Sequence, residues 1–406
     1  MCDSNGTEEA VNILVLPSWY PNEVSPLGGI FVQEQAQAYA ELNPLDNVIV
    51  SKWNDGYCEV TPRKPISLLR ALWKSINTKV SDVQIEDNFY EFYTPSRIVW
   101  SRKLPFGGYN SLYKSFRKTF IRVRKAFGSI DVIHAHVSYP AGYLASRLAK
   151  EFNLPLVLTE HMSPFPFDRY LKDGKPIKEI SQAFRNANQV IAVSSSLQKK
   201  IQSFGLPCHQ VIPNFIDDKK FTPVSKKGTK FRFFTLCAIS EQKGIDVLIK
   251  AISLLAPPLN ESLEFFIGGE GVQLGYYKRL AESLGLTNVH WLGQVSRVEA
   301  PRLFQAAHAY IMLSRHETFG IVYAEAIATG IPVIATRCGG PEDIINEING
   351  LLVEVDNHEK ARSAIEYIYA NYSKFDPQEI RKDFEKRFSK TVFAEKLKQA
   401  YRSAIK

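Results

Sequence analysis

The chain lacks any apolar run that approaches the roughly 18 consecutive residues that a membrane-spanning helix requires. It has only 5 Cys among 406 residues, and they are too far apart for a disulfide framework or a zinc site. Short internal repeats and low-complexity tracts are also missing from the sequence. These absences exclude a helical membrane-spanning protein, a small disulfide-stapled domain and a repeat protein.

The composition is that of a well-packed globular protein, with 45% hydrophobic and 23% charged residues. A chain of 406 residues exceeds one ordinary hydrophobic core, so two domains of similar size are expected. The opening segment MCDSNGTEEAVNILVLPSWYP carries acidic residues where a secretion signal would carry basic ones. Together with the dispersed cysteines, this predicts a cytoplasmic protein.

Positive charge is concentrated in one part of the N-terminal half. Residues 61–130 contain 14 Lys and Arg against 4 Asp and Glu, a local net charge of +10 in a chain of net charge +8. The remaining residues therefore sum to −2. This imbalance suggests an anionic partner for that region, such as membrane headgroups, a lipid phosphate or nucleic acid.

Short β-rich apolar runs alternate with helical patterns along the chain. In the N-terminal half the predicted strands are 11–17, 131–136, 155–161 and 189–196, and the helical patterns include 29–42 and 141–152. After a turn-rich segment at 211–223, further strands are predicted at 231–239, 263–269, 289–295, 309–315 and 331–337. Such alternation predicts parallel sheets covered by helices on both faces.

The expected architecture is therefore α/β, with two doubly wound Rossmann-like domains. We predict an N-terminal, acceptor-side domain at residues 1–210 and a C-terminal, donor-binding domain at 211–380. A C-terminal helix within 381–406 is expected to return to the N-terminal domain. Ligands of such sheets bind at the carboxyl ends of the strands, so the chemistry is expected there.

The most informative stretch is SRHETFGIVYAEAIATGIPVIATRCGGPEDII at 314–345. A helix is predicted from about Ile321, and its N-terminus at Gly320 would present free N–H groups and a positive dipole end. Glu317 precedes this helix, and Glu325 lies within it among apolar residues. The two carboxylates can bind different hydroxyls of one elongated polar ligand. The alternative is a capping Glu followed by a solvated Glu.

This stretch resembles the signature of the retaining, family-4-type glycosyltransferases of the GT-B fold. The elements of that signature are Glu317, Phe319, Gly320, Glu325, Gly330, Pro332, Val333, Gly339 and Gly340. The resemblance implies that Glu317 contacts the hydroxyls of a donor sugar as a catalytic residue. It also implies that the backbone of Thr318, Phe319 and Gly320 binds sugar and phosphate, and that Glu325 binds the ribose.

Weaker matches extend the resemblance over nearly the whole chain. SEQKG at 240–244 resembles the phosphate loop of the family, and IPNFID at 212–217 resembles its Ile-Pro-Asn-Gly-Val-Asp element, with Phe215 in place of Gly. LPSWYP…PLGG at 16–29 resembles the opening of a subgroup linked to bacterial surface-polysaccharide assembly.

One position departs from the family pattern. Many relatives place an Arg five residues before the loop Lys, whereas this chain has Ala238 before Lys243. We predict that Lys243 binds the donor diphosphate, either with helix dipoles alone or with Arg315 or Arg337 as the second base. The alternative for Lys243 is an ordinary solvated loop lysine.

The N-terminal half is expected to supply the rest of the site. Gly28-Gly29 lies between a predicted strand and helix, which suits a backbone approach to phosphate, although a plain loop pair is the alternative. His136 and His161 each end a strand, so we predict a catalytic role for His136 and donor binding for Gly29 and His161. His134 is expected to be structural. A His-Ala-His metal pair lacks a third ligand at suitable spacing, and no paired-Asp motif is present, so no metal is predicted.

The basic region at 97–125 has two interpretations. Tyr113, Phe116, Phe120, Val123 and Phe127 have helical spacing with Lys and Arg between them, as in a helix packed on its own sheet. The second interpretation is docking on an anionic membrane on the cytoplasmic face, which Trp100, Leu104 and Phe106 would assist.

The sequence as a whole predicts a retaining, metal-independent glycosyltransferase of bacterial surface-polysaccharide synthesis. Its substrates would be a UDP- or GDP-sugar donor and a glycan or lipid-linked glycan acceptor, with no further cofactor and no nucleic acid. The donor's anomeric carbon is expected between Glu317 and His136. Three alternatives stay open: a nucleotide-sugar epimerase, a nucleic-acid- or nucleotide-binding protein using the basic region, and a non-catalytic scaffold of the same fold.

Overall fold

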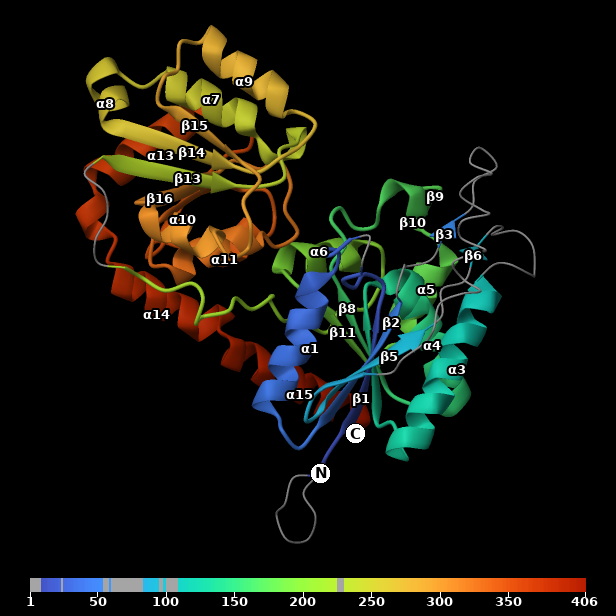
Figure 1. Cartoon of the computed structure of the whole chain (residues 1–406). Helices are drawn as coiled ribbons and strands as arrows, with labels where there is room; N and C mark the ends of the chain where they lie inside the picture. The colour runs from blue at the N-terminus through green and yellow to red at the C-terminus, as the bar shows by residue number, and fades with distance from the viewer. Residues whose placement is uncertain are drawn as a thin grey trace. The chain divides into compact units, whose positions relative to one another are not determined.

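The computed structural model describes residues 9–22, 25–53, 58–59, 83–94, 98–99, 109–224 and 230–406. The chain forms two compact units, one built on a mostly parallel sheet and the other on a parallel sheet (Figure 1). Unit 1 comprises Met1–Val193, Gln198–Ile212 and Ala394–Lys406, and unit 2 comprises Ser194–Leu197 and Pro213–Phe393. The predicted α/β class with two Rossmann-like domains is confirmed.

The sheet of unit 1 has the strand order β12-β11-β8-β7-β1-β2-β5-β4. Its strands are β1 (Asn12–Pro17), β2 (Asn47–Trp53), β4 (Val83–Glu86), β5 (Phe89–Thr94), β7 (Val132–His136), β8 (Leu156–Glu160), β11 (Gln189–Ala192) and β12 (Gln210–Val211). Every pair is parallel except β4 with β5. Because both faces are covered, β7 and β8 are buried at every position.

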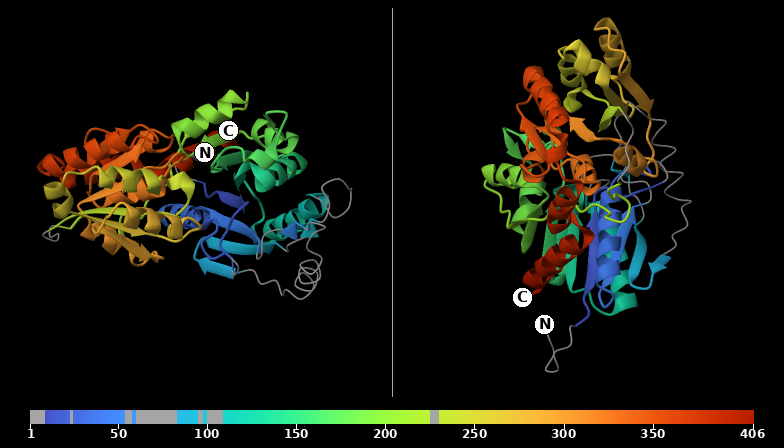
Figure 2. Two further views of the ribbon diagram at one scale, coloured as in Figure 1. Left: turned by 90° about the horizontal axis from the view of Figure 1, so that it is seen from above. Right: turned by 90° about the vertical axis from the view of Figure 1, so that its left-hand side faces the viewer.

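Helices cover both faces of this sheet. The helices are α1 (Ile30–Leu42), α3 (Tyr109–Phe127), α4 (Tyr143–Phe152), α5 (Lys178–Arg185), α6 (Ser195–Ser203) and α15 (Lys390–Ile405). α1 and α15 lie side by side on one face, where the rings of Tyr39 and Tyr401 meet edge to face at 5.1 Å (Figures 1 and 2). α3 and α4 lie on the other face, with Phe120 and Phe152 in ring contact at 4.3 Å.

Smaller elements complete the described part of unit 1. They are the strands β3 (Cys58–Glu59), β6 (Ile98–Val99), β9 (Leu171–Lys172) and β10 (Lys175–Pro176), a π-helical turn η1 (Ser138–Gly142) and a 3₁₀ turn η2 (Asp168–Tyr170). β3 pairs with β6, and β9 pairs with β10, each as a separate two-stranded ladder. None of the described helices of the chain is both long and apolar enough to span a membrane.

The sheet of unit 2 has the strand order β15-β14-β13-β16-β17-β18, all parallel. Its strands are β13 (Phe231–Leu236), β14 (Leu263–Gly268), β15 (Val289–Gly293), β16 (Ala309–Met312), β17 (Val333–Thr336) and β18 (Gly350–Val353). The first five occupy the positions that the apolar runs predict, and each ends one to three residues earlier. The polar and glycine residues at those ends enter the loops where ligands of such sheets bind.

The helices and turns of unit 2 connect and cover this sheet. They are η3 (Glu241–Lys243), α7 (Ile245–Ser253), α8 (Pro257–Ser262), α9 (Leu274–Ser283), α10 (Ala300–Ala306), α11 (Ile321–Ala328), α12 (Pro341–Ile344), α13 (His358–Ala370), η4 (Tyr372–Lys374) and α14 (Pro377–Phe388). Phe215, which replaces a Gly of the family pattern, packs its ring against Phe393 at 5.3 Å.

The C-terminal segment returns to unit 1, as predicted for the helix at 381–406, but it is not a single helix. It forms two helices, α14 and α15, separated by Ser389, which has extended backbone angles. α14 stays in unit 2 because Ile380, Phe384 and Phe388 are buried there, and only Ala394–Lys406 belongs to unit 1.

Each sheet reverses its strand order at one point. In unit 2 the chain builds β13, β14 and β15 outward and then resumes on the other side of β13 with β16. In unit 1 the corresponding point lies between β1 and β7. Loops diverge at such switch points and leave room for ligands, so β13/β16 and β1/β7 locate the candidate sites.

Candidate active site

The switch point of unit 2 brings Lys243 and Glu317 together. Lys243 lies in the turn after β13, and Glu317 lies in the loop between β16 and α11. The Lys243 ammonium donates a hydrogen bond to Oε1 of Glu317 at 2.5 Å, and the Ser314 hydroxyl donates to the same oxygen at 2.9 Å. The two predicted ligand-binding residues, 74 positions apart, thus form one ion pair.

The Gly339-Gly340 loop holds the main chain of Glu317. Glu317 and Gly339 form an isolated parallel β-bridge, and the Gly340 N–H donates to the Glu317 carbonyl at 2.8 Å. The Glu317 N–H donates to the Cys338 carbonyl at 3.3 Å. Because Glu317 is only 7% exposed, its carboxylate has little freedom to leave this position.

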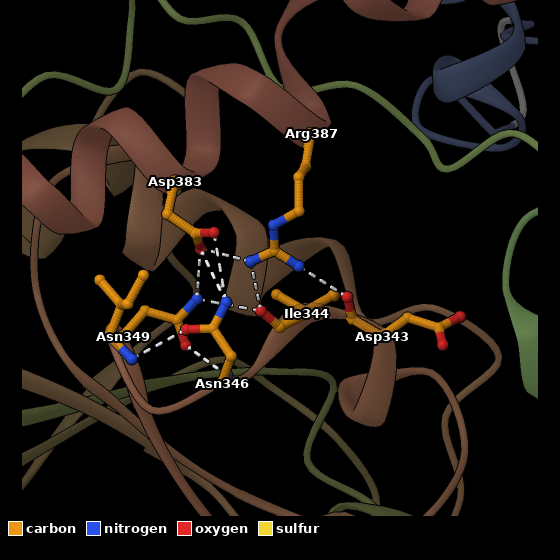
Figure 3. Close-up of polar contacts among 7 residues, drawn as sticks. Asp343, Ile344, Asn346, Asn349, Asp383 and Arg387 are labelled. Atoms are coloured by element: carbon orange, nitrogen blue, oxygen red, sulfur yellow. Dashed lines mark hydrogen bonds and ion pairs between the residues drawn. The ribbon is translucent and has the colours of Figure 1, made fainter.

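A polar cluster fixes the end of that loop on α14 (Figure 3). Arg387 donates to the carbonyls of Asp343 and Ile344, each at 2.8 Å, and pairs with Asp383 on its own helix. Asn346 and Asn349 donate to the Asp383 carboxylate, with Asn349 at 2.8 Å. The arginine therefore satisfies the terminal carbonyls of α12, the short helix that follows Gly340.

Gly320 opens α11 in a backbone conformation that other residues rarely adopt. Its φ is 90°, and an added Cβ would lie 2.5 Å from the ring of Tyr323. No side chain caps this helix end, so its N–H groups remain available to a ligand. Thr318 and Phe319 are buried, and the Phe319 ring contacts Phe388, which leaves their main chain as the part that can meet a ligand.

Glu325 lies in the middle of α11, between the buried residues Ala324 and Ala326, and is itself half-buried. The resemblance to the family implies a ribose-binding role for this carboxylate.

Arg315, one of the two residues predicted as a second phosphate-binding base, is bound by two carboxylates. Its guanidinium donates to Asp246 at 2.7 Å and to Asp356 at 2.8 Å, and the hydrogen bond to Asp246 raises the pKa of Arg315. Its backbone N–H donates to the Gln242 carbonyl at 2.7 Å, so Arg315 anchors the loop that carries Lys243. Arg337 is exposed at the end of β17.

Two thiols near this ion pair are protonated at neutral pH. Burial raises the pKa of Cys237 to about 12 and that of Cys338 to about 11. A protonated thiol is a poor nucleophile, so neither cysteine suits covalent catalysis.

The switch point of unit 1 brings the predicted histidines together. His136 ends β7 and His161 follows β8, and Nδ1 of His136 lies 3.1 Å from Nε2 of His161. Burial lowers the pKa of His136 to about 3 and that of His161 well below its usual value. Both imidazoles are therefore neutral at pH 7, and each can donate or accept a hydrogen bond but carries no charge.

Two features beside the histidine pair were not indicated by the sequence. Val137 has a φ of 71°, a strained value for a β-branched residue. The buried Glu160 carboxylate accepts hydrogen bonds from the backbone N–H groups of Ser138, His161 and Met162, at 2.8–3.0 Å. Glu160 thus holds both segments that carry the histidine pair, and no spacing rule pointed to it.

Gly29 begins α1 at the same switch point. Its φ is 72°, and an added Cβ would lie 2.3 Å from the main chain of Trp19. The glycine is therefore required by close backbone packing at this position. The α1 N-terminus that it opens has no side-chain cap.

Comparison with known proteins identifies the chain. Residues 216–390 match the family described as Glycosyl transferases group 1, and residues 84–220 match the family described as Glycosyltransferase Family 4. The chain belongs to the family-4-type glycosyltransferases of the GT-B fold. The glycosyltransferase activity expected from the motif at 314–345 is thereby confirmed at the level of the family.

Individual relatives are distant. An uncharacterized glycosyltransferase of Methanocaldococcus jannaschii is 29% identical over 262 residues, which cover 64% of this chain and 72% of that protein. Sucrose-phosphate synthase from Thermosynechococcus elongatus has a similar structure, with a TM-score of 0.70, 18% identity, and coverage of 97% of this chain and 98% of that one. Anabaena HepE in complex with UDP and glucose has a TM-score of 0.65, 19% identity, and coverage of 97% and 99%.

Proposed function

We propose that this glycosyltransferase retains anomeric configuration and moves a sugar from a UDP- or GDP-sugar to a glycan or lipid-linked glycan acceptor. The observation that carries the proposal is the Lys243–Glu317 pair at the β13/β16 switch point, beside the uncapped N-terminus of α11. One cation and one carboxylate there suit a ligand with a diphosphate at one end and hydroxyls at the other. The similarity to HepE, which is described with UDP and glucose, supports a nucleotide sugar.

The donor would separate the ion pair. Lys243 would turn to the diphosphate, while the Glu317 carboxylate, still bonded to Ser314, would accept hydrogen bonds from sugar hydroxyls. Glu325 would bind the ribose hydroxyls. His136, supported by His161 and with Gly29 on the neighbouring loop, would hydrogen-bond the sugar as a neutral imidazole.

In the reaction, the bond between the anomeric carbon and the phosphate oxygen breaks, and its electron pair leaves with the nucleoside diphosphate. The acceptor hydroxyl attacks from the same face, and its proton passes to the departing phosphate oxygen. Lys243 and the α11 N-terminus stabilise the charge that develops on that oxygen. We propose that the positive charge of Lys243 and the α11 N-terminus makes a metal ion unnecessary.

The acceptor class is inferred from sequence features. The opening LPSWYP…PLGG supports a role in assembling a bacterial surface polysaccharide, and the basic face of α3 supports an acceptor carried by lipid on the cytoplasmic face. On α3, Tyr113, Phe116, Phe120 and Val123 are buried and Phe127 is half-buried, as predicted for a helix packed on its own sheet. Trp100, Leu104 and Phe106 lie outside the described residues.

Thermal unfolding in the presence of nucleotides tests the donor class. We expect UDP or GDP, but not ADP, to raise the melting temperature, because binding at 100 times Kd adds about 2.7 kcal/mol to the free energy of unfolding. The shift should persist in EDTA and should not increase with Mn²⁺. Absence of a shift with every nucleotide and nucleotide sugar would contradict the proposal. Nucleotide release without any acceptor, accompanied by sugar isomerisation, would indicate an epimerase.

Flotation with vesicles tests the membrane proposal. Lys114, Lys118 and Lys125 are exposed on one face of α3, and each should contribute about 1 kcal/mol to binding an anionic surface. Changing all three to Glu should abolish co-flotation with phosphatidylglycerol vesicles at low salt. The same change at Lys250, Lys278 and Lys374, exposed on unit 2, is the matched control. Equal losses in both variants, or no flotation of the unmodified protein, would refute docking through α3.

A further inference from the structure

Tyr401 of the C-terminal helix contacts the histidines of unit 1 from a distant part of the chain. Its hydroxyl lies 2.8 Å from Nδ1 of His134, although the two residues are 267 positions apart. The rings of Tyr401 and His134 meet edge to face, with centroids 5.4 Å apart. Tyr401 is only 4% exposed, so this contact is buried.

His134 connects Tyr401 to His136, because its ring contacts both residues. Its other nitrogen, Nε2, lies 2.8 Å from the Thr159 hydroxyl, so both ring nitrogens have partners. The His134 ring lies against that of His136, with centroids 4.2 Å apart. His136 in turn hydrogen-bonds His161, whose ring contacts Phe31 in the first turn of α1 at 4.6 Å.

The groups of this chain of contacts are neutral, so the direction of each hydrogen bond depends on the tautomer of His134. Burial lowers the pKa of His134 well below its usual value and raises that of Tyr401 well above its own. Tyr401 therefore keeps its hydroxyl proton, and His134 is a neutral ring with one donor and one acceptor. When the Tyr401 hydroxyl donates to Nδ1, the single ring proton of His134 lies on Nε2 and is donated to Thr159.

We propose that Tyr401 is a positioning residue for His136, acting through the tautomer and ring plane of His134. The last helix then supports the candidate site of unit 1 without contributing a group that contacts substrate. In the tautomer with the ring proton on Nε2, loss of the Tyr401 hydroxyl leaves Nδ1 of His134 as a buried acceptor without this donor, and the ring must turn or change tautomer to regain one. Either change alters the position or the hydrogen bonding of the His134 ring, which packs against the ring of His136. This inference rests on the proposed role of His136.

Tyr39 offers a matched control on the same face of the sheet. It is also buried, its ring contacts that of Tyr401, and its hydroxyl donates to Asp46 at 2.7 Å. Tyr39→Phe and Tyr401→Phe each remove one buried hydroxyl and keep the ring. A purely structural role for Tyr401 predicts similar consequences for the two variants.

The first experiment is NMR of the full chain with ¹⁵N-labelled histidine, which requires no substrate. We expect the unmodified protein to show His134 protonated on Nε2. Tyr401→Phe should change that tautomer and shift the ring resonances of His136 and His161, whereas Tyr39→Phe should leave all three in place. Unchanged histidine resonances in Tyr401→Phe, or equal shifts in both variants, would overturn the proposal.

The second experiment measures turnover of the nucleotide sugar that the thermal-shift screen selects. Tyr401→Phe should lower kcat about tenfold with little change in KM, and Tyr39→Phe should change kcat less than twofold. In a His136→Gln background the effect of Tyr401→Phe should disappear, because coupled residues are not additive. A tenfold loss that persists in that background would refute action through His136. Full activity of His136→Gln alone would instead refute the proposed role of His136.

Discussion

Replacing Glu317 by Gln should lower kcat about 100-fold or more, within the range seen when one preorganised transition-state contact is removed. The amide keeps the size of the side chain and its contact with Ser314. It loses the negative charge at Oε1, which pairs with Lys243 and would accept hydrogen bonds from the sugar hydroxyls. KM for the donor should change much less, because the contact strengthens as the sugar develops positive charge. Steady-state kinetics on the donor chosen by thermal shift measures both quantities.

Glu325→Gln provides the comparison for this prediction, since it changes a second carboxylate of the same segment. If Glu325 binds the ribose, its variant should chiefly raise KM, because the ribose does not change during the reaction. A Glu317→Gln enzyme with normal kcat, or identical kinetic profiles for the two variants, would contradict the assigned roles.

Replacing Lys243 by Met should weaken nucleoside diphosphate binding by about 10- to 100-fold, the size expected for one charged hydrogen bond. It should also destabilise the protein, because Glu317 is 7% exposed and would lose its cation. Breaking a buried ion pair costs about 3 kcal/mol, and less here since the Lys243 side chain is 20% exposed. Isothermal titration with UDP and GDP, together with thermal unfolding, separates the two effects.

The double variant Lys243→Met/Glu317→Gln tests the pairing itself. With both charges removed, much of the lost stability should return, whereas nucleotide affinity should stay low. Lys250→Met, an exposed lysine on α7, should change neither quantity. Tight nucleotide binding by Lys243→Met would show that another group, such as Arg337, binds the diphosphate. No recovery of stability in the double variant would show that the ion pair contributes little to folding.

Much of the fold follows from local patterns in the sequence. The runs VNILVLP, FRFFTLCAI and LEFFIGG form β1, β13 and β14, because continuous apolar segments are stable only inside a sheet covered on both faces. Gly320 and Gly330 mark the ends of α11, with φ values of 90° and 70° that glycine adopts without strain. Interactions between chain neighbours decide these features.

The C-terminal segment shows where local patterns stop being sufficient. A helical pattern continues through residues 377–405, with only Ser389 between α14 and α15. Each of the two helices belongs to the unit whose apolar face it covers. Those apolar faces exist only once the sheets have assembled. The transition at Ala394 could therefore not be derived from the segment alone.

In the candidate site, too, some features follow from the sequence and others only from the tertiary structure. Glu317, Gly320, Glu325 and the ends of β7 and β8 could be recognised from the sequence, because each stands in a short motif or at the end of an apolar run. Three features could not be recognised from the sequence. They are the Lys243–Glu317 pair, the hydrogen bonds that Glu160 accepts from Ser138, His161 and Met162, and the Tyr401–His134 contact. Strand order brings these groups together across 74, 22 and 267 positions, respectively. Residue types and turn chemistry act over a few neighbours, whereas partners at such separations are decided only when the sheets assemble.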